Sequence, residues 1–277
     1  MMGQQPPPAV EVEVLAWLPS CQEDPEFGTP NRQKEYATTL KTEGLHAAVW
    51  MYEPSALTTV SALNKEIGLN VNPWVPNMRA YLRDASEHGV VGAALQRFMR
   101  LPLPDKARIA LHNIRRAIGV VRRDFTTGLL IMVDMELVRF RRYGASAAFL
   151  NASVTDLVLA LDDPRLLREF LGLVRRTYGL EAGLATYNYG VLVERLQAWR
   201  VFPEVIVAPF NSRGYLMNPS KERCERALRT SQIPVLATHI EVDGLVKRQD
   251  AVAYLRGLGI KRALASRSPS RGGRGQG

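Results

Sequence analysis

Two carboxylates stand two residues apart in the segment LLIMVDMELV, directly after an apolar run. Alternate side chains of a strand point to the same side, so a strand here would place Asp134 and Glu136 together. Two such close carboxylates repel each other, and near an apolar core one takes a raised pKa or both share a cation. The pair predicts general acid/base catalysis or a divalent metal ion, with pairing to Arg139 as the structural alternative.

A histidine and another carboxylate repeat this spacing in the segment VLATHIEV. His239 and Glu241 follow an apolar run and are expected to face Asp134 and Glu136 across a shared mouth. A histidine with three carboxylates would suit a divalent metal ion, and a histidine acting alone would suit acid/base catalysis. These four residues are the predicted catalytic residues, and they are also the candidates for a metal site.

Further polar and aromatic side chains follow other apolar runs and are expected to bind substrate. Amide side chains both donate and accept hydrogen bonds, so they orient polar molecules. Trp74 would stack on a sugar or base, or fill the core. Arg79 would hold a carboxylate or phosphate, or remain solvated on its helix. The predicted substrate-binding residues are Glu53, Asn72, Trp74, Arg79, Tyr187, Asn188 and Asn211.

Short apolar runs alternate with helical patterns along the whole chain, which is typical of βα units and a parallel sheet. Runs such as LLIMV and VIVA are apolar on both faces, as strands covered on both sides require. We predict eight strands, at residues 12–18, 47–53, 70–75, 129–137, 183–188, 205–210, 235–240 and 262–266.

Eight such units predict an α/β fold, a (β/α)8 TIM barrel, whose active site lies at the carboxyl ends of the strands. Two helices, at residues 78–99 and 105–123, form an expected insertion after strand three. After Ser266 the chain has no room for the usual eighth helix. The groove left beside strand eight would then be covered by the inserted helices or by a second copy in a homodimer.

The 277 residues predict one barrel domain at 9–266, between a disordered start at 1–8 and a disordered Gly/Ser/Arg tail at 267–277. The formal net charge is +9, and five basic residues lie from Lys261 onward without an acid. Such a tail would contact RNA weakly or stay solvated. Cys21 and Cys224 are far apart, and no signal peptide or membrane span is recognised, so a cytoplasmic location is expected.

Other catalytic classes lack their signatures. Near the predicted strand ends the one lysine is Lys247, in the loop after strand seven, which argues against a Schiff-base aldolase mechanism. The chain has no G-x-S-x-G, no G-x-x-x-x-G-K-[ST] and no G-x-G-x-x-G segment.

The segment IPVLATHIEVDGLVKRQDAVAYLRGLGIKRALAS resembles the seventh and eighth βα units of aldolase-type TIM barrels. Many of those bind a phosphate through glycines at these strand ends, where this chain has His239–Ile240–Glu241 and Ser266–Arg267–Ser268. The pattern Pro209-Phe210-Asn211 followed by Met217-Asn218-Pro219 is similar to an uncharacterised prokaryotic TIM-barrel family. Asp134-x-Glu136 is similar to part of the acidic strand-four motif of chitinase-like glycosidases.

The expected function is therefore a metabolic hydrolase or lyase that acts on a small polar or carbohydrate-like substrate by carboxylate or metal-assisted chemistry. One alternative is a glycoside hydrolase with Glu136 as acid, in which its separation from Glu53 or Glu241 decides retention or inversion. Another is a barrel scaffold without catalysis, or a weak RNA-binding protein.

Overall fold

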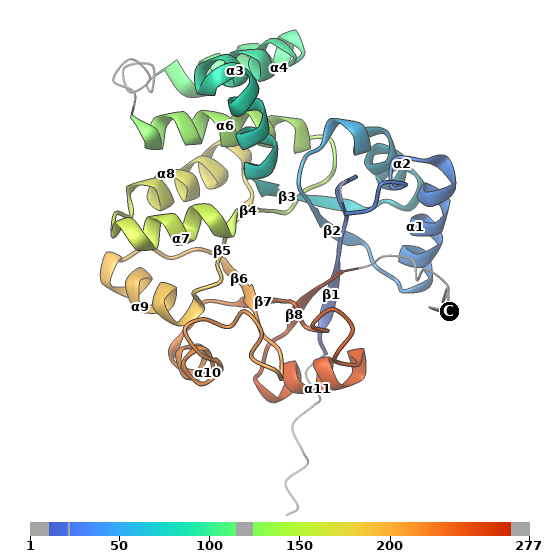
Figure 1. Ribbon diagram of the computed structural model, residues 1–277, viewed down its shortest axis with the longest axis vertical. Helices are drawn as coiled ribbons and strands as arrows, with labels where there is room; N and C mark the ends of the chain where they lie inside the picture. Colours follow the sequence, from blue (N-terminus) through green and yellow to red (C-terminus); the bar gives the residue numbers. More distant parts are fainter. Residues whose placement is uncertain (1–10, 22, 115–123, 267–277) are drawn as a thin grey trace, which may run out of the picture.

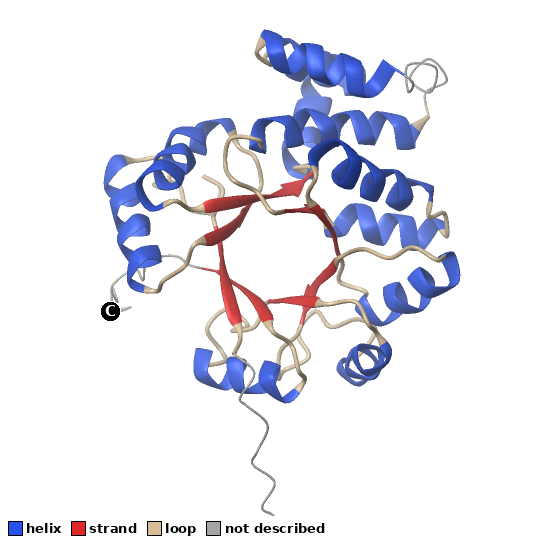
Figure 2. Cartoon of the chain, turned by 180° about the vertical axis from the view of Figure 1, so that it is seen from behind, coloured by secondary structure: helices blue, strands red, loops and turns tan. Residues whose placement is uncertain are grey.

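The computed structural model describes residues 11–21, 23–114 and 124–266, and these form a closed barrel of eight parallel strands in sequence order. The ring of strands is surrounded by helices (Figure 2). The barrel closes where β1 (Glu13–Trp17) pairs with β8 (Arg262–Ser266), in register from Glu13 with Arg262 to Trp17 with Ser266. The expected TIM barrel is confirmed.

Seven of the eight predicted strands are confirmed. Besides β1 and β8 they are β2 (Ala47–Trp50), β3 (Asn70–Val75), β5 (Glu181–Ala185), β6 (Val205–Pro209) and β7 (Val235–Thr238). Inward side chains such as Leu15, Phe149, Val207 and Leu264 fill the barrel, while two larger clusters pack between the strands and the outer helices.

The predicted strand at 129–137 is wrong, because this segment belongs to helix α6 (Phe125–Phe140). Its apolar residues do not alternate between two sheet faces. One helical row, which includes Leu130, Val133 and Leu137, packs on the barrel core, and Met135 and Val138 pack on the inserted helices. A helix covered on both sides has a continuous apolar sequence, and so does a buried strand, so the two cannot be distinguished from this pattern.

The fourth strand is β4 (Ala147–Leu150), four buried residues that pair with β3 and β5. It follows α6 and was not recognised in the sequence, because it is short and apolar on every side chain. It is followed by α7 (Ala152–Leu161), α8 (Arg165–Leu173) and the π-helical turn η3 (Val174–Tyr178).

The predicted two-helix insertion after strand three is present as α3 (Met78–Met99) and α4 (Leu103–Asn113), and α6 then serves as the barrel helix. Both inserted helices lie outside the ring, over α6 (Figure 1). Gly89 has φ 70° and ψ 162°, so α3 is two helical segments joined at a kink. The predicted continuation of α4 to residue 123 falls outside the described residues.

The remaining helices follow the expected alternation. They are α1 (Pro30–Thr42), the turn η1 (Pro54–Ala56), α2 (Leu57–Ile67), α9 (Tyr189–Trp199), α10 (Lys221–Thr230) and α11 (Arg248–Gly257). The predicted disordered ends and the absence of an eighth helix concern residues outside the described part of the chain. None of the helices described is long and apolar enough to cross a membrane.

Candidate functional site

A cavity of about 910 Å³ opens at the carboxyl ends of the strands, where this fold carries its active sites. Every strand contributes to its wall. Seven do so through one of their last two residues or the residue that follows, and β8 does so through its middle residue, Leu264. The contributing residues, from β1 to β8, are Trp17, Met51, Trp74, Asn151, Ala185, Pro209, Thr238 and Leu264. We call this space the mouth cavity.

Two tryptophans give part of the mouth cavity an aromatic wall. The ring centroids of Trp17 and Trp74 lie 5.5 Å apart at an interplanar angle of 89°, an edge-to-face contact. Trp17 Nε1 donates to Glu23 Oε2 at 3.2 Å, which fixes the indole at the end of β1. Trp74 also packs against Phe149 of β4 inside the barrel. The barrel core therefore holds both rings in place.

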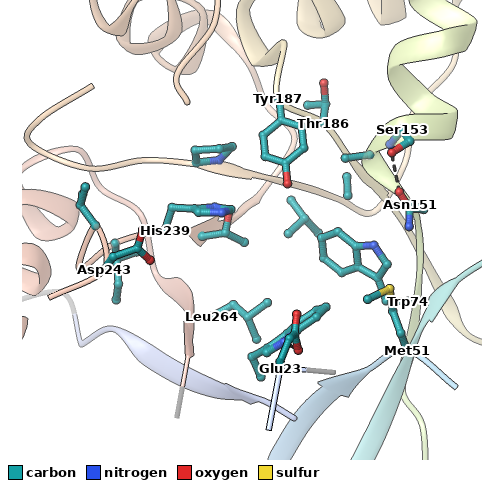
Figure 3. A pocket seen from close by; sticks show the side chains of 18 of the residues that line it. Glu23, Met51, Trp74, Asn151, Ser153, Thr186, Tyr187, His239, Asp243 and Leu264 are labelled. Carbon is teal, nitrogen blue, oxygen red and sulfur yellow. Dashed lines mark hydrogen bonds between the residues drawn. The ribbon is translucent and has the colours of Figure 1, made fainter. Parts of the chain in front are cut away.

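His239 projects into the same space from the end of β7, with Tyr187 across from it and Trp74 beside them (Figure 3). Its ring packs on Tyr187 and Tyr215 at centroid distances of 5.9 and 6.2 Å, and Nδ1 lies 3.1 Å from Thr238 Oγ1. The backbone has φ 52°, a left-handed conformation that is uncommon for residues other than glycine.

The charge on His239 is controlled by its surroundings. His239 is an exposed residue, but the cavity wall partly desolvates its ring and lowers its pKa below the ordinary value of 6.5, and Asp243 partly opposes this shift. The imidazole is therefore mainly neutral at pH 7 and able to accept a proton.

The end of β5 is held by an acidic residue behind the cavity wall. Asp156 of α7 accepts hydrogen bonds from the Thr186 hydroxyl and, at 3.2 Å, from the Tyr187 backbone N–H. Burial raises the pKa of Asp156, although these hydrogen bonds act in the opposite direction. Asp156 therefore positions Thr186 and Tyr187, both of which line the mouth cavity.

A second pocket of about 290 Å³ lies beside the mouth cavity, between the start of α3 and α6. Met51 and Arg79 line both spaces, so the two adjoin. Glu53 and Glu136 lie in this second space, which we call the side pocket, and so do five arginines.

Glu136 is buried in the side pocket and accepts from the Asn77 backbone N–H at 3.1 and 3.0 Å, through its two oxygens. Burial raises its pKa to about 8, against the lowering effects of the Asn77 N–H, Arg97 and Arg139. This carboxyl group is therefore largely protonated at pH 7.

The predicted pairing of Asp134 with Glu136 is wrong, because residues two apart on a helix lie about 200° apart around its axis. Asp134 is fully buried away from both pockets. It contacts His112 Nδ1 at 3.2 Å, Asn113 Nδ2 at 2.6 Å and the Tyr178 hydroxyl. It therefore connects α4 and α6 to the turn η3.

The four predicted catalytic residues do not converge. His239 and Glu241 line the mouth cavity, Glu136 lines the side pocket, and Asp134 lines neither. Glu241 forms a bidentate ion pair with Arg248, at 3.0 Å for both contacts. Within residues 11–21, 23–114 and 124–266, no three His, Cys, Asp or Glu side chains come together as a metal site.

The predicted substrate-binding residues divide into two groups. Trp74, Arg79 and Tyr187 line the mouth cavity, and Glu53 lines the side pocket, where its carboxylate accepts from Cys21 N at 2.7 Å. The three asparagines lie outside both linings. Asn72 binds the backbone of β2 and the start of β4, Asn188 precedes α9 and hydrogen-bonds Asp156, and Asn211 closes the loop to Tyr215.

Sequence reasoning missed Trp17, Asn151 and Thr186 at the cavity wall. Asn151 had a readable signal, because the short apolar run AAFL is followed by Asn-Ala-Ser, and Asn151 caps α7 by accepting from Ser153 N at 3.0 Å (Figure 3). A strand ending in a cap residue marks a βα junction, and such junctions form the active-site face of a barrel.

Comparison of the sequence with protein-family models and with curated proteins finds no match.

Proposed function

We propose that this chain is an enzyme, a hydrolase or lyase, that performs acid/base chemistry on a small polar, carbohydrate-like molecule in the mouth cavity. The observation that carries the proposal is the position of His239, a partly desolvated histidine between two tyrosine rings at the end of β7. A neutral imidazole in such a place is suited to take a proton from a bound substrate.

Tyr187 supplies the complementary acid. Desolvation and the nearby Asp156 raise the pKa of its phenol, and Arg79 opposes them. The phenol therefore keeps its proton at pH 7 and donates a hydrogen bond to a substrate oxygen on which charge develops. A base after β7 and a donor after β5, on either side of β6, form the minimum set for elimination or hydrolysis.

The aromatic wall supports a carbohydrate-like substrate. The C–H faces of a sugar ring pack on indole rings, while its hydroxyls need donors and acceptors around the rim. Trp17 and Trp74 offer the indole rings. The hydrogen-bond donors and acceptors come from Asn151, Ser153 and Thr186. The aldolase-type resemblance of strands seven and eight agrees with a barrel enzyme, although none of the described lysines lines either pocket for a Schiff base.

A glycoside hydrolase is the second candidate, and it has less support. Such an enzyme needs a protonated carboxylic acid facing a second carboxylate. The described carboxyl groups with raised pKa values are Glu43, Glu136 and Asp156, and none of them lines the mouth cavity. The segment that is similar to chitinase-like glycosidases lies on α6, away from the strand ends.

Divalent metal dependence and a homodimer remain predictions. So does weak RNA contact by the tail, which falls outside the described residues. The two cysteines are free, and with them we propose a cytoplasmic location. The alternative from another class is a barrel scaffold without catalysis.

The test is ligand-dependent thermal unfolding with a panel of neutral sugars, sugar acids and small hydroxy acids. A ligand at 100 times its Kd stabilises the folded state by about 2.7 kcal/mol. We expect a stabilising ligand whose effect disappears in Trp74→Ala. His239→Gln should retain binding and lose turnover of that ligand, which proton NMR of the mixture detects.

The matched control is His88→Gln, on the exposed surface of α3. It should leave both binding and turnover unchanged. If a bound ligand is turned over equally by the wild type and His239→Gln, the assigned base is wrong. If no ligand of the panel shifts unfolding of the wild type, the carbohydrate-like substrate class is contradicted and the scaffold alternative is favoured.

A further inference from the structure

We propose that the side pocket binds a phosphate-type oxyanion, carried by the molecule in the mouth cavity or by a separate small ligand. The substrate consequence rests on the proposed function, whereas the anion site itself does not.

Positive charge dominates the lining of the side pocket. Five arginines contribute to it, namely Arg79, Arg83, Arg97, Arg100 and Arg139. Arg97 is paired with Asp84 at 2.7 Å, and Arg83 lies 3.7 Å from the same carboxylate. Among the described residues, the other three form no ion pair with a carboxylate. Arginines gathered without counterions favour an anionic ligand, because the guanidinium fork matches the oxygens of phosphate.

Arg139 is the most confined of these three. Its Nη1 donates to the Tyr52 hydroxyl at 2.7 Å, and its guanidinium carbon lies 4.5 Å from the centre of the Tyr52 ring. Its Nε is buried and has no hydrogen-bond partner within the described part of the chain. Buried donors are nearly always satisfied, and a charged donor left over at a pocket wall indicates a place for an acceptor.

The acidic groups in the pocket do not cancel this charge. The Asp84 carboxylate is engaged by Arg97, and Glu53 accepts the Cys21 backbone N–H. Glu136 lies 3.7 Å from Arg97, farther than Asp84, and burial favours its neutral form. The pocket therefore keeps a net positive charge at neutral pH.

The start of helix α3 adds to the positive electrostatic potential of the side pocket. Helix α3 starts at Met78, directly at the pocket, with Asn77 as its cap and Ala80 in the lining. Its N-terminal amide groups carry the positive end of the helix dipole, although the Asn77 side chain already accepts the Ala80 N–H. This contribution is secondary to the arginines but has the same sign.

The position of Arg79 connects the pocket to the proposed active site. Arg79 is exposed and lines both the mouth cavity and the side pocket. A molecule whose ring lies against Trp74 could therefore extend an anionic group past Arg79 toward Arg139. On this basis the substrate class narrows from polar to phosphorylated.

The experiment is calorimetric titration of the whole protein with inorganic phosphate at constant ionic strength, with chloride as the reference anion. We expect saturable binding that weakens about tenfold or more in Arg139→Gln and in Arg100→Gln, since each removes a charge-assisted contact. Arg100 is exposed, so its replacement does not threaten folding. Arg256→Gln, an exposed arginine of α11, is the control and should bind phosphate as the wild type does.

Absence of saturable phosphate binding in the wild type would overturn the proposal, and so would equal weakening by Arg256→Gln. The source of the phosphate is decided by titrating glucose 6-phosphate against glucose. If one molecule spans both spaces, Trp74→Ala weakens the sugar phosphate and leaves inorganic phosphate unchanged. If the sugar phosphate binds no more tightly than phosphate alone, the site takes a separate phosphate. If phosphate binds but no ligand of the mouth cavity is found, the proposed function is contradicted and the anion site in the side pocket stands.

Discussion

Arg97 forms an ion pair with Asp84 across the kink of α3. Its Nε and Nη2 lie 2.8 and 2.7 Å from Asp84 Oδ2. In a straight helix, thirteen residues span about 20 Å, too far for this contact. The left-handed Gly89 reverses the chain and makes it possible. Because Arg97 also lies over the Tyr81 ring and near Glu136, the ion pair fixes the inserted helices against the side pocket.

Asp84→Asn should therefore loosen the insertion. The ion pair is only about one-sixth exposed on each side, so we expect a loss of about 1–3 kcal/mol in the free energy of unfolding. Urea denaturation of the two proteins measures it. Glu66→Gln, which breaks the exposed ion pair with Lys41, is the control and should have almost no effect. An equal loss in both variants would contradict a special role for the kink.

Glu136 should make stability fall as the pH rises. Its folded-state pKa is raised from 4.5 to about 8, so the folded protein holds a proton that the unfolded chain has lost between these values. The free energy of unfolding therefore declines through that window and levels off above it. Glu136→Gln removes this contribution, so the variant should gain stability relative to the wild type as pH rises from about 5 to about 9.

Denaturation curves of both proteins across that range test the sign. Gln keeps an oxygen for the Asn77 N–H, so the substitution changes the charge and little else. A pH-independent difference between the two proteins would mean that Glu136 is ionised in the folded state, and the net charge assigned to the side pocket would have to be lowered.

The fold could be read from seven strands whose apolar runs are bounded by turns, and the failure at α6 has a specific cause. Leu129, Leu130 and Val133 face the barrel, while Ile131 and Met135 face α4. The segment therefore lacks the polar face by which an amphipathic helix is recognised in a sequence. The hydrophobic pattern depends on what covers the segment. That depends in turn on an insertion whose packing is a tertiary property, absent from the local sequence.

The site was partly predictable for the same reason. His239, Trp74 and Tyr187 follow strands that were recognised, and they line the mouth cavity. Asp134 and Glu136 were paired by an alternation that a helix does not have. The side pocket was not predicted. It brings Tyr52 and Glu53 together with arginines of α3 and α6, and the spacing of these residues in the sequence does not indicate that they are close in space.

The His239 ring should titrate below its ordinary value. Desolvation by the cavity wall lowers the pKa of this imidazole, and the Asp243 carboxylate raises it. Proton NMR of the imidazole signals follows the titration, and the His239→Gln spectrum identifies the resonance. Asp243→Asn should lower the pKa further, because it removes the opposing charge. A midpoint at or above 6.5 would remove the argument for a neutral base at pH 7.

Asn72 should matter for stability rather than for ligand binding. Its Oδ1 accepts from the backbone N–H groups of Ser146 and Ala147 at 3.0 and 2.9 Å, and its Nδ2 donates to Ala48 O at 3.2 Å. It thus joins β2 to the start of β4, where the short ladder between β3 and β4 begins only at Trp74 and Phe149.

Asn72→Ala leaves two backbone donors and one acceptor of the barrel wall without this partner. We expect a loss of about 2–4 kcal/mol, measured by urea denaturation. Asn31→Ala, on the exposed side of α1, is the matched control and should change stability little. Any ligand of the mouth cavity should bind the folded Asn72→Ala protein with its original affinity. If Asn72→Ala has unchanged stability but no longer binds the ligand, Asn72 binds substrate, as the sequence analysis predicted.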